Sequence, residues 1–257
     1  MLHPKTTVLI RRSLLLSFVL AGIASCSDNE PTSVETQAGG TGSNPSAADI
    51  HESSLVLDAH ADIVIPSTSR AYMSADGTSK VDPAKMRAGG VDAVVMSVAV
   101  GPGPRTMEGD AAARAEADEK IAAVHTLVEE SQGQVVIATT SSEIVAAHEA
   151  GKSALILGFQ NARSLQGNVS AIDEFYAEGV RIFGLNHLGH NAFSDSSRPE
   201  FSGETGAFEV TEEHGGLSTL GVAAVERIGA LGALVDVSQL SKAATLQVLE
   251  LTRTPII

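Results

Sequence analysis

The stretch LVLDAHADIV, residues 55–64, decides the fold class because an apolar run turns polar where a strand should end. The run begins like a buried strand, and Asp58, His60 and Asp62 then follow at intervals of two residues. Side chains two residues apart on a strand point to the same face. We therefore expect the three ionisable groups to lie together at the carboxyl end of a strand.

Short apolar runs alternate with helical patterns through the rest of the sequence. Helix starts are marked by Asp, Thr or Ser caps, and several helix ends are marked by Gly. This order, with strands apolar on both faces, predicts a parallel sheet covered by helices. The predicted strands are 55–60, 91–100, 154–160, 180–187 and 233–239. A further short strand is predicted at 135–139, without a prediction of whether it belongs to the same sheet, and 254–257 is predicted to begin another strand. The predicted helices are 82–90, about 110–130, 140–151, 170–179, 218–232 and one capped by Ser241.

Two architectures fit this order, namely a doubly wound open sheet and a (β/α)8 TIM-like barrel. The first strand-to-helix turn has no Gly-rich phosphate loop, which weakens a dinucleotide-binding interpretation. Polar residues instead follow several strands, and a barrel gathers such strand ends around one mouth, where its active sites lie. The sequence therefore favours the barrel. These residues are His60 and Asp62, Gln160 and Asn161, Asn186 and His187, and Ser238 and Gln239.

The charge of the chain excludes one large class of partner. The 31 acidic and 17 basic residues give a formal net charge of −14 at pH 7. Binding to nucleic acid requires a basic face that neutralises phosphates. We therefore expect no nucleic-acid partner. The single cysteine, Cys26, excludes an internal disulfide.

The first 26 residues are typical of a bacterial lipoprotein signal peptide. Basic residues precede an apolar run at 13–24 that is too short to span a membrane, and IASC (23–26) resembles a lipobox. We expect a lipid anchor at Cys26, on the periplasmic side of a bacterial envelope and at the outer membrane. An ordinary cleaved signal is the alternative. Residues 27–52 are predicted to be a flexible Ser/Thr/Gly-rich linker, and the folded domain is predicted at 53–257.

The pair His60 and Asp62 suggests a metal site. A neutral imidazole and a carboxylate on one face can bind one divalent ion, for which zinc is the most natural choice. A hydrogen-bonded strand end without metal is the alternative.

Five further motifs lie along the sequence: DAHAD (58–62), DPAKMRAGGVDAVVMSV (82–98), ALILGFQNARSL (154–165), GVRIFGLNHLGHNAFSDSS (179–197) and HGGLSTLGVAAVERIGALGALVDVSQLS (214–241). Together with the polar strand ends, these motifs resemble those of the membrane dipeptidase (renal dipeptidase) family, zinc peptidase family M19. The resemblance extends from Leu55 to Ile257, and the motifs occur in the family's order and spacing.

The resemblance implies a (β/α)8 barrel in which metal-activated water attacks the amide carbonyl of a dipeptide. It implies that His60 and Asp62 bind the first metal and that His187 faces the substrate and the tetrahedral intermediate. Asp58 is expected to be an inner support of this site. Asn161, His190 and Asp195 are expected to support the site or contact the substrate, with His190 an alternative to His187.

Two positions depart from the family pattern. Gln160 stands where the family has a glutamate that bridges two metals, and Gln239 stands where it has a histidine ligand. Neutral amides are poor zinc ligands. We therefore expect about one zinc ion per chain rather than two. About five barrel strands and the start of a sixth are expected here, and the sequence is expected to belong to a longer protein that completes the barrel.

Two classes of function remain open on the sequence. The first is a metallohydrolase that cleaves dipeptides or related small amides. The second is a catalytically degenerate barrel that binds a peptide or metabolite. Metal content distinguishes the two. The oligomeric state is left open.

Overall fold

The computed structural model describes residues 44–202 and 206–257, and the statements on structure below refer to these residues. The helices and strands lie in one unit, Pro45–Ile257. The predicted signal peptide and residues 27–43 of the predicted linker fall outside the described residues. Helix α1 (Ala47–Ser53) lies inside the predicted linker, so the predicted start of the folded part near Ser53 is too late. The reason is a capping box between Ser46 and Asp49, which the sequence interpretation did not take into account.

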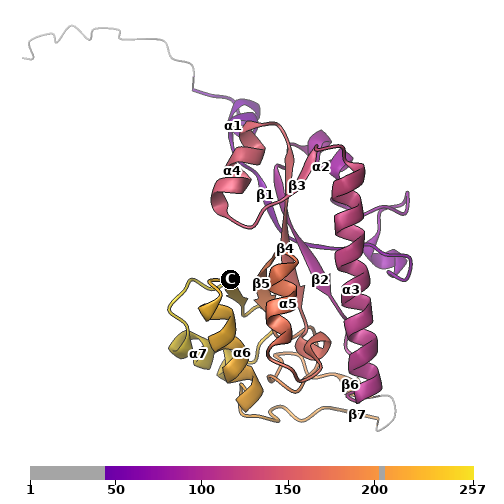
Figure 1. Cartoon of the computed structure of the whole chain (residues 1–257), viewed down its shortest axis with the longest axis vertical. Coiled ribbons are helices and arrows are strands. Elements are labelled where there is room, and N and C mark those ends of the chain that lie inside the picture. The colour runs from indigo at the N-terminus through magenta and orange to yellow at the C-terminus, as the bar shows by residue number, and fades with distance from the viewer. Residues whose placement is uncertain (1–43, 203–205) are drawn as a thin grey trace, which may run out of the picture. The chain divides into compact units, whose positions relative to one another are not determined.

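Six parallel strands form the main sheet (Figure 1). Five of them follow one another as β1 (Leu57–Asp62), β2 (Ala93–Ala99), β4 (Ser153–Gln160), β5 (Val180–Gly184) and β8 (Leu234–Asp236). The short strand predicted at 135–139 is β3 (Val135–Ile137), and it belongs to this sheet because it pairs with the first residues of β4. Ile256 forms a parallel bridge with Val235, so the last residues extend the sheet beyond β8.

The helix caps expected from the sequence are present. Asp82 caps α2 (Pro83–Gly89), Thr140 caps α4 (Ser141–Glu149), Ser218 caps α6 (Thr219–Ala230) and Ser241 caps α7 (Lys242–Leu251). Helix α3 (Met107–Glu130) begins earlier than expected because the Thr106 side chain accepts a hydrogen bond from the Gly109 N–H. The remaining elements are α5 (Ala171–Ala177), the 3-10 turns Arg70–Tyr72 and Ala162–Leu165, and an antiparallel pair of β6 (Phe201–Ser202) and β7 (Ala207–Phe208).

The two faces of the sheet differ in what covers them. Helices α2, α3, α5, α6 and α7 pack on one face, where their apolar residues join outward-facing strand residues such as Val94, Leu157 and Phe183 in the larger core cluster. The other face carries a smaller cluster around Val95 and Ile156, and of the described helices only α4 adds residues to it. A doubly wound sheet is covered by helices on both faces. The arrangement is instead that of part of a (β/α)8 barrel, which confirms the predicted fold class.

No helix among residues 44–202 and 206–257 has both the length and the apolar character needed to cross a membrane.

Candidate active site

The pairing of the strands brings inward-facing residues into a row at the carboxyl ends of four strands. Ala99 pairs with Gln160, Gln160 with Gly184, and Gly184 with Asp236. Gln160 lies four residues after Ile156 and therefore on the same inner face. Gly184 leaves room in this row, since a Cβ atom there would lie 3.6 Å from Asp236 Oδ2. The mouth of the barrel is thus lined by Gln160 and Asp236 across a glycine.

His60 and Asp62 lie side by side at the end of β1. His60 Nε2 is 4.0 Å from Asp62 Oδ1, and the two side chains are 48% and 30% exposed. Asp62 pairs with Ser97, two residues beyond Val95, so this part of β1 belongs to the inner face. The predicted pair therefore exists as a geometric unit at the mouth.

Asp58 does not share that face by regular alternation. The strand has a bulge between Asp58 and Ala61, and Asp58 pairs with Val94 whereas Asp62 pairs with Ser97. Val94 and Ser97 are three residues apart and so lie on opposite faces of β2. The prediction of a common face is therefore wrong for Asp58. Its Oδ1 atom instead accepts the His60 backbone N–H at 3.0 Å, which holds the bulge.

The donor atoms of His60 and Asp62 fit two neighbouring ligands of one divalent ion. Zinc sites, however, usually have three or four protein ligands. No group of three or more His, Cys, Asp or Glu residues that could hold a metal occurs in the described part of the chain. The described residues thus hold two side chains that could be metal ligands and no complete ligand set.

The two glutamines that are expected to stand at ligand positions of the family pattern lie in different environments. Gln160 is only 7% exposed, and its side-chain amide has no hydrogen-bond partner among the described residues. The side-chain oxygen of Gln239 accepts the Leu188 backbone N–H at 2.7 Å. Gln160 therefore offers a free amide at the mouth, whereas the oxygen of Gln239 is already used within the protein.

His187 is half-buried and is held through one ring nitrogen. Nδ1 lies 3.1 Å from the Val100 carbonyl oxygen, which can only accept, so Nδ1 carries the proton. Nε2 then has a free lone pair in the neutral ring, and no described residue bonds to it. Asn161 donates to the same Val100 oxygen at 3.1 Å and to the Gly101 oxygen at 3.3 Å. The buried amide of Asn161 therefore supports the loop that holds His187.

His190 is buried, and both of its ring nitrogens are engaged. Nε2 donates to the Val210 carbonyl oxygen at 2.7 Å, and Nδ1 accepts the Ser196 N–H at 2.9 Å. Neither nitrogen is left to act on a substrate. The alternative that placed His190 in the role of His187 is therefore wrong, because the loop folds back on this ring.

Asp195 is also a buried structural residue. Its carboxylate accepts the backbone N–H groups of Glu213, His214 and Gly216 at 2.9–3.1 Å. Burial raises the pKa of this carboxyl group, but these three N–H donors outweigh burial, and the pKa lies below its ordinary value. The expectation that Asp195 contacts the substrate is wrong, since its side chain is fully buried and both oxygens bind the 213–216 loop.

Arg163 is a structural determinant that the sequence interpretation missed. It is 8% exposed and donates to the carbonyl oxygens of Gly101 and Pro104, each at 2.9 Å, and to Asp110 at 3.2 Å. With Leu188 and other loop residues, it lines a cleft of about 400 Å³ beside the mouth. The signal in the sequence was a cation three residues after the end of a buried strand.

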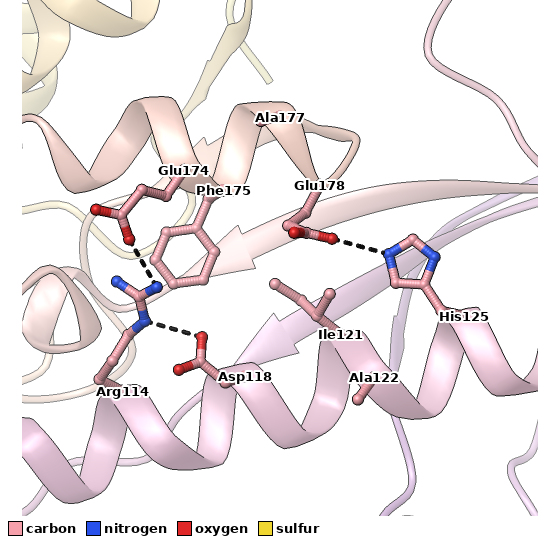
Figure 2. A pocket seen from close by; sticks show the side chains of 9 residues that line it. All are labelled: Arg114, Asp118, Ile121, Ala122, His125, Glu174, Phe175, Ala177 and Glu178. Carbon is pink, nitrogen blue, oxygen red and sulfur yellow. Dashed lines mark hydrogen bonds and ion pairs between the residues drawn. The ribbon is translucent and has the colours of Figure 1, made fainter.

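A second cavity, of about 650 Å³, lies on the outer helices (Figure 2). Its charged groups are paired with one another, as Arg114 with Asp118 and Glu174 at 2.8 Å, and His125 with Glu178 at 3.0 Å. These residues lie on α3, on α5 and at Glu178 directly after α5, and the two helices cover the outer face of the sheet. We assign no chemistry to this cavity.

Comparison with known families matches residues 45–257 to the model of membrane dipeptidases, peptidase family M19. The chain belongs to the membrane dipeptidase family. The family assignment confirms the resemblance found from the sequence motifs. It places the chain in a family of metal-dependent peptidases.

Dipeptidases are among the proteins and solved structures that the chain resembles. The chain is 30% identical over 139 residues to dipeptidase verJ of Clonostachys rogersoniana. The matched region covers 54% of this chain and 33% of verJ. A crystal structure of the probable dipeptidase PvdM from Pseudomonas aeruginosa has a TM-score of 0.72 at 30% identity, covering 81% of this chain and 52% of that one. A crystal structure of a metallopeptidase from Rhodobacter sphaeroides, liganded with a phosphinate mimic of the dipeptide L-Ala-D-Ala, shares the fold. Its TM-score is 0.62 at 17% identity, and the match covers 79% of this chain and 63% of that chain. The chain thus spans about a third of verJ and about half of PvdM.

Proposed function

We propose that the complete protein is a metal-dependent hydrolase that cleaves the amide bond of dipeptides or related small amides. The observation that carries this proposal is the pair of His60 and Asp62 on the inner face of β1, 4.0 Å apart, in a chain of the membrane dipeptidase family. The chain spans only part of its relatives, and the activity is therefore proposed for the whole protein.

In this proposal His60 and Asp62 supply two ligands of one zinc ion. When bound, the ion would lower the pKa of a coordinated water and would polarise an amide carbonyl. His187, held through Nδ1 by the Val100 oxygen, presents Nε2 to the substrate. Nε2 accepts a proton in the neutral ring and donates a hydrogen bond to a developing oxyanion once it is protonated.

We propose that the site binds one zinc ion rather than two, because the described residues at the mouth lack an anionic bridge. Two cations a few ångströms apart repel each other strongly unless an anionic ligand bridges them. Gln160 is neutral and cannot serve as such a bridge. The Gln239 oxygen is occupied by the Leu188 N–H. A second ion therefore lacks both ligands that the family pattern would give it.

We further propose that the protein is anchored by a lipid at Cys26, on the periplasmic side of a bacterial envelope. This location rests on the basic segment, the apolar run at 13–24 and the IASC sequence alone. A dipeptide-cleaving enzyme there would act on small peptides outside the cytoplasm.

Hydrolysis of a dipeptide panel tests the proposed activity. The complete protein, expressed from its own gene with zinc, is assayed on L,L- and L,D-dipeptides with and without a chelator. His60→Ala is expected to abolish hydrolysis and His187→Ala to lower it by about 100-fold or more. The matched control is His125→Ala, which removes a surface ring paired with Glu178 and should leave activity unchanged. Chelator-resistant hydrolysis, or peptide binding without hydrolysis, would contradict the proposal.

A further inference from the structure

Gln239 forms a side-chain bond to the backbone directly after His187. Its Oε1 atom accepts the Leu188 N–H at 2.7 Å. Leu188 has a φ of 54°, a left-handed conformation that is unfavourable for a bulky side chain and persists only where the surroundings impose it. The bond to Gln239 is one of the contacts that hold this unfavourable turn.

The backbone of Gln239 binds the same loop a second time. Its carbonyl oxygen accepts the Ser197 N–H at 3.0 Å and the Ser196 hydroxyl at 3.2 Å. The segment that follows β8 is thus joined to both ends of the loop that follows β5. His187 lies at the start of this loop, and its ring is held separately by the Val100 oxygen.

We propose that Gln239 is a positioning residue that fixes His187 at the mouth of the barrel, rather than a weakened metal ligand. The oxygen of a neutral amide is the atom that it would offer to a cation, and here that oxygen binds Leu188. Gln239, in the segment after β8, thereby fixes the backbone of Leu188, the residue after His187. The Val100 oxygen, in the loop after β2, fixes the ring of His187. The proposal rests on the proposed function in that His187 acts on the substrate.

Variants of two glutamines test this role in the complete protein. Gln239→Leu removes the acceptor at similar volume, and Gln239→Glu keeps an acceptor oxygen at the same place. The matched control is Gln247→Leu, because Gln247 Oε1 accepts the Leu217 N–H at 2.6 Å, a bond of the same kind on another loop. Each variant is measured for kcat, KM, zinc content and thermal midpoint.

Gln239→Leu is expected to lower kcat by about 10- to 100-fold, since a small misplacement of a reacting group costs that much. Its KM should change by less than about threefold, and its zinc content should equal that of the wild type. Gln239→Glu should recover kcat to within about threefold of the wild type, while Gln247→Leu should lower the thermal midpoint as much as Gln239→Leu and leave kcat unchanged. Equal kcat values in the two leucine variants would overturn the proposal.

A readout without turnover separates this proposal from the activity itself. Nitrogen NMR spectra report which ring nitrogen of His187 carries the proton, and hydrogen exchange reports the protection of the Leu188 amide. In Gln239→Leu the Leu188 amide should exchange at least about 10-fold faster, and the His187 ring should lose its single protonation pattern. If the wild type hydrolyses no dipeptide, the proposed function fails, and these two measurements alone decide the positioning role. Unchanged spectra and exchange in Gln239→Leu would overturn it.

Discussion

Replacing Asp195 by asparagine should destabilise the protein far more than its small change in shape suggests. The carboxylate is fully buried and accepts four hydrogen bonds, from the backbone N–H groups of Glu213, Gly216 and, through both oxygens, His214. Asparagine has one oxygen and turns an NH₂ group toward the other donors. At least one N–H then loses its acceptor and faces a second donor.

The magnitude follows from the bonds that are lost. A hydrogen bond to a charged group contributes about 1.5–3 kcal/mol, and a buried donor without a partner costs about 1–3 kcal/mol. One loss of each kind gives about 2.5–6 kcal/mol, a large part of the stability of a typical domain. The 213–216 loop, which Asp195 holds, should also become more open to proteolysis.

Urea unfolding at neutral pH measures this loss, with Asp76→Asn as the control. Asp76 is an exposed carboxylate that accepts the Thr78 N–H, and an asparagine oxygen can replace it there. Its ion pair with Lys85 at 3.1 Å is also exposed, and such pairs contribute little to stability. The control should leave the unfolding midpoint nearly unchanged. A loss of less than about 1 kcal/mol in Asp195→Asn would refute the account of the buried carboxylate.

The acid side of the stability curve gives a second check on Asp195. Its pKa is lower in the folded protein than in the unfolded chain, where it is about 3.9. The contribution of the carboxylate is therefore fully present above the unfolded pKa and is lost as pH falls through the folded pKa. The difference between wild type and Asp195→Asn should shrink as the pH is lowered below about 4.

Three further changes test other parts of the structure. Arg163→Met should cost about 3 kcal/mol, because it leaves the Pro104 oxygen and Asp110 without their donor and the Gly101 oxygen with Asn161 alone, and limited proteolysis should then cut near residues 101–106. Thr140→Ala should lower stability by about 1 kcal/mol in urea unfolding through loss of the α4 capping box, whereas Thr140→Ser should not. Cys26→Ser should move the protein from the membrane fraction to the soluble fraction or leave it unprocessed, and a wild type that is fully soluble would contradict the lipid anchor.

The fold could be predicted largely because its signals are local. Caps such as Asp82 and Ser218, and the apolar strands between them, place the helices and strands within a few residues. The bulge in β1 was not predictable in this way. The i, i+2 rule assumes a regular pleat, and nothing in LVLDAHADIV marks the extra residue that removes Asp58 from the common face.

The site was predicted only in part because roles there depend on long-range partners. The sequence placed Gln239 at a strand end, but its bond to Leu188 joins residues 51 positions apart. His190 resembled His187 in sequence, yet the Val210 carbonyl, 20 residues away, occupies its Nε2 atom. Such partners are chosen by how loops fold over the mouth, and local patterns do not report them.

The zinc content of the complete protein tests the central claim most directly. The protein is purified with zinc available, dialysed and measured by elemental analysis, with His60→Ala alongside. The account predicts about one zinc ion per chain in the wild type and none in His60→Ala, because His60 and Asp62 form the one ligand pair on the inner face of β1. Two tightly held ions, or no metal in the wild type, would contradict it.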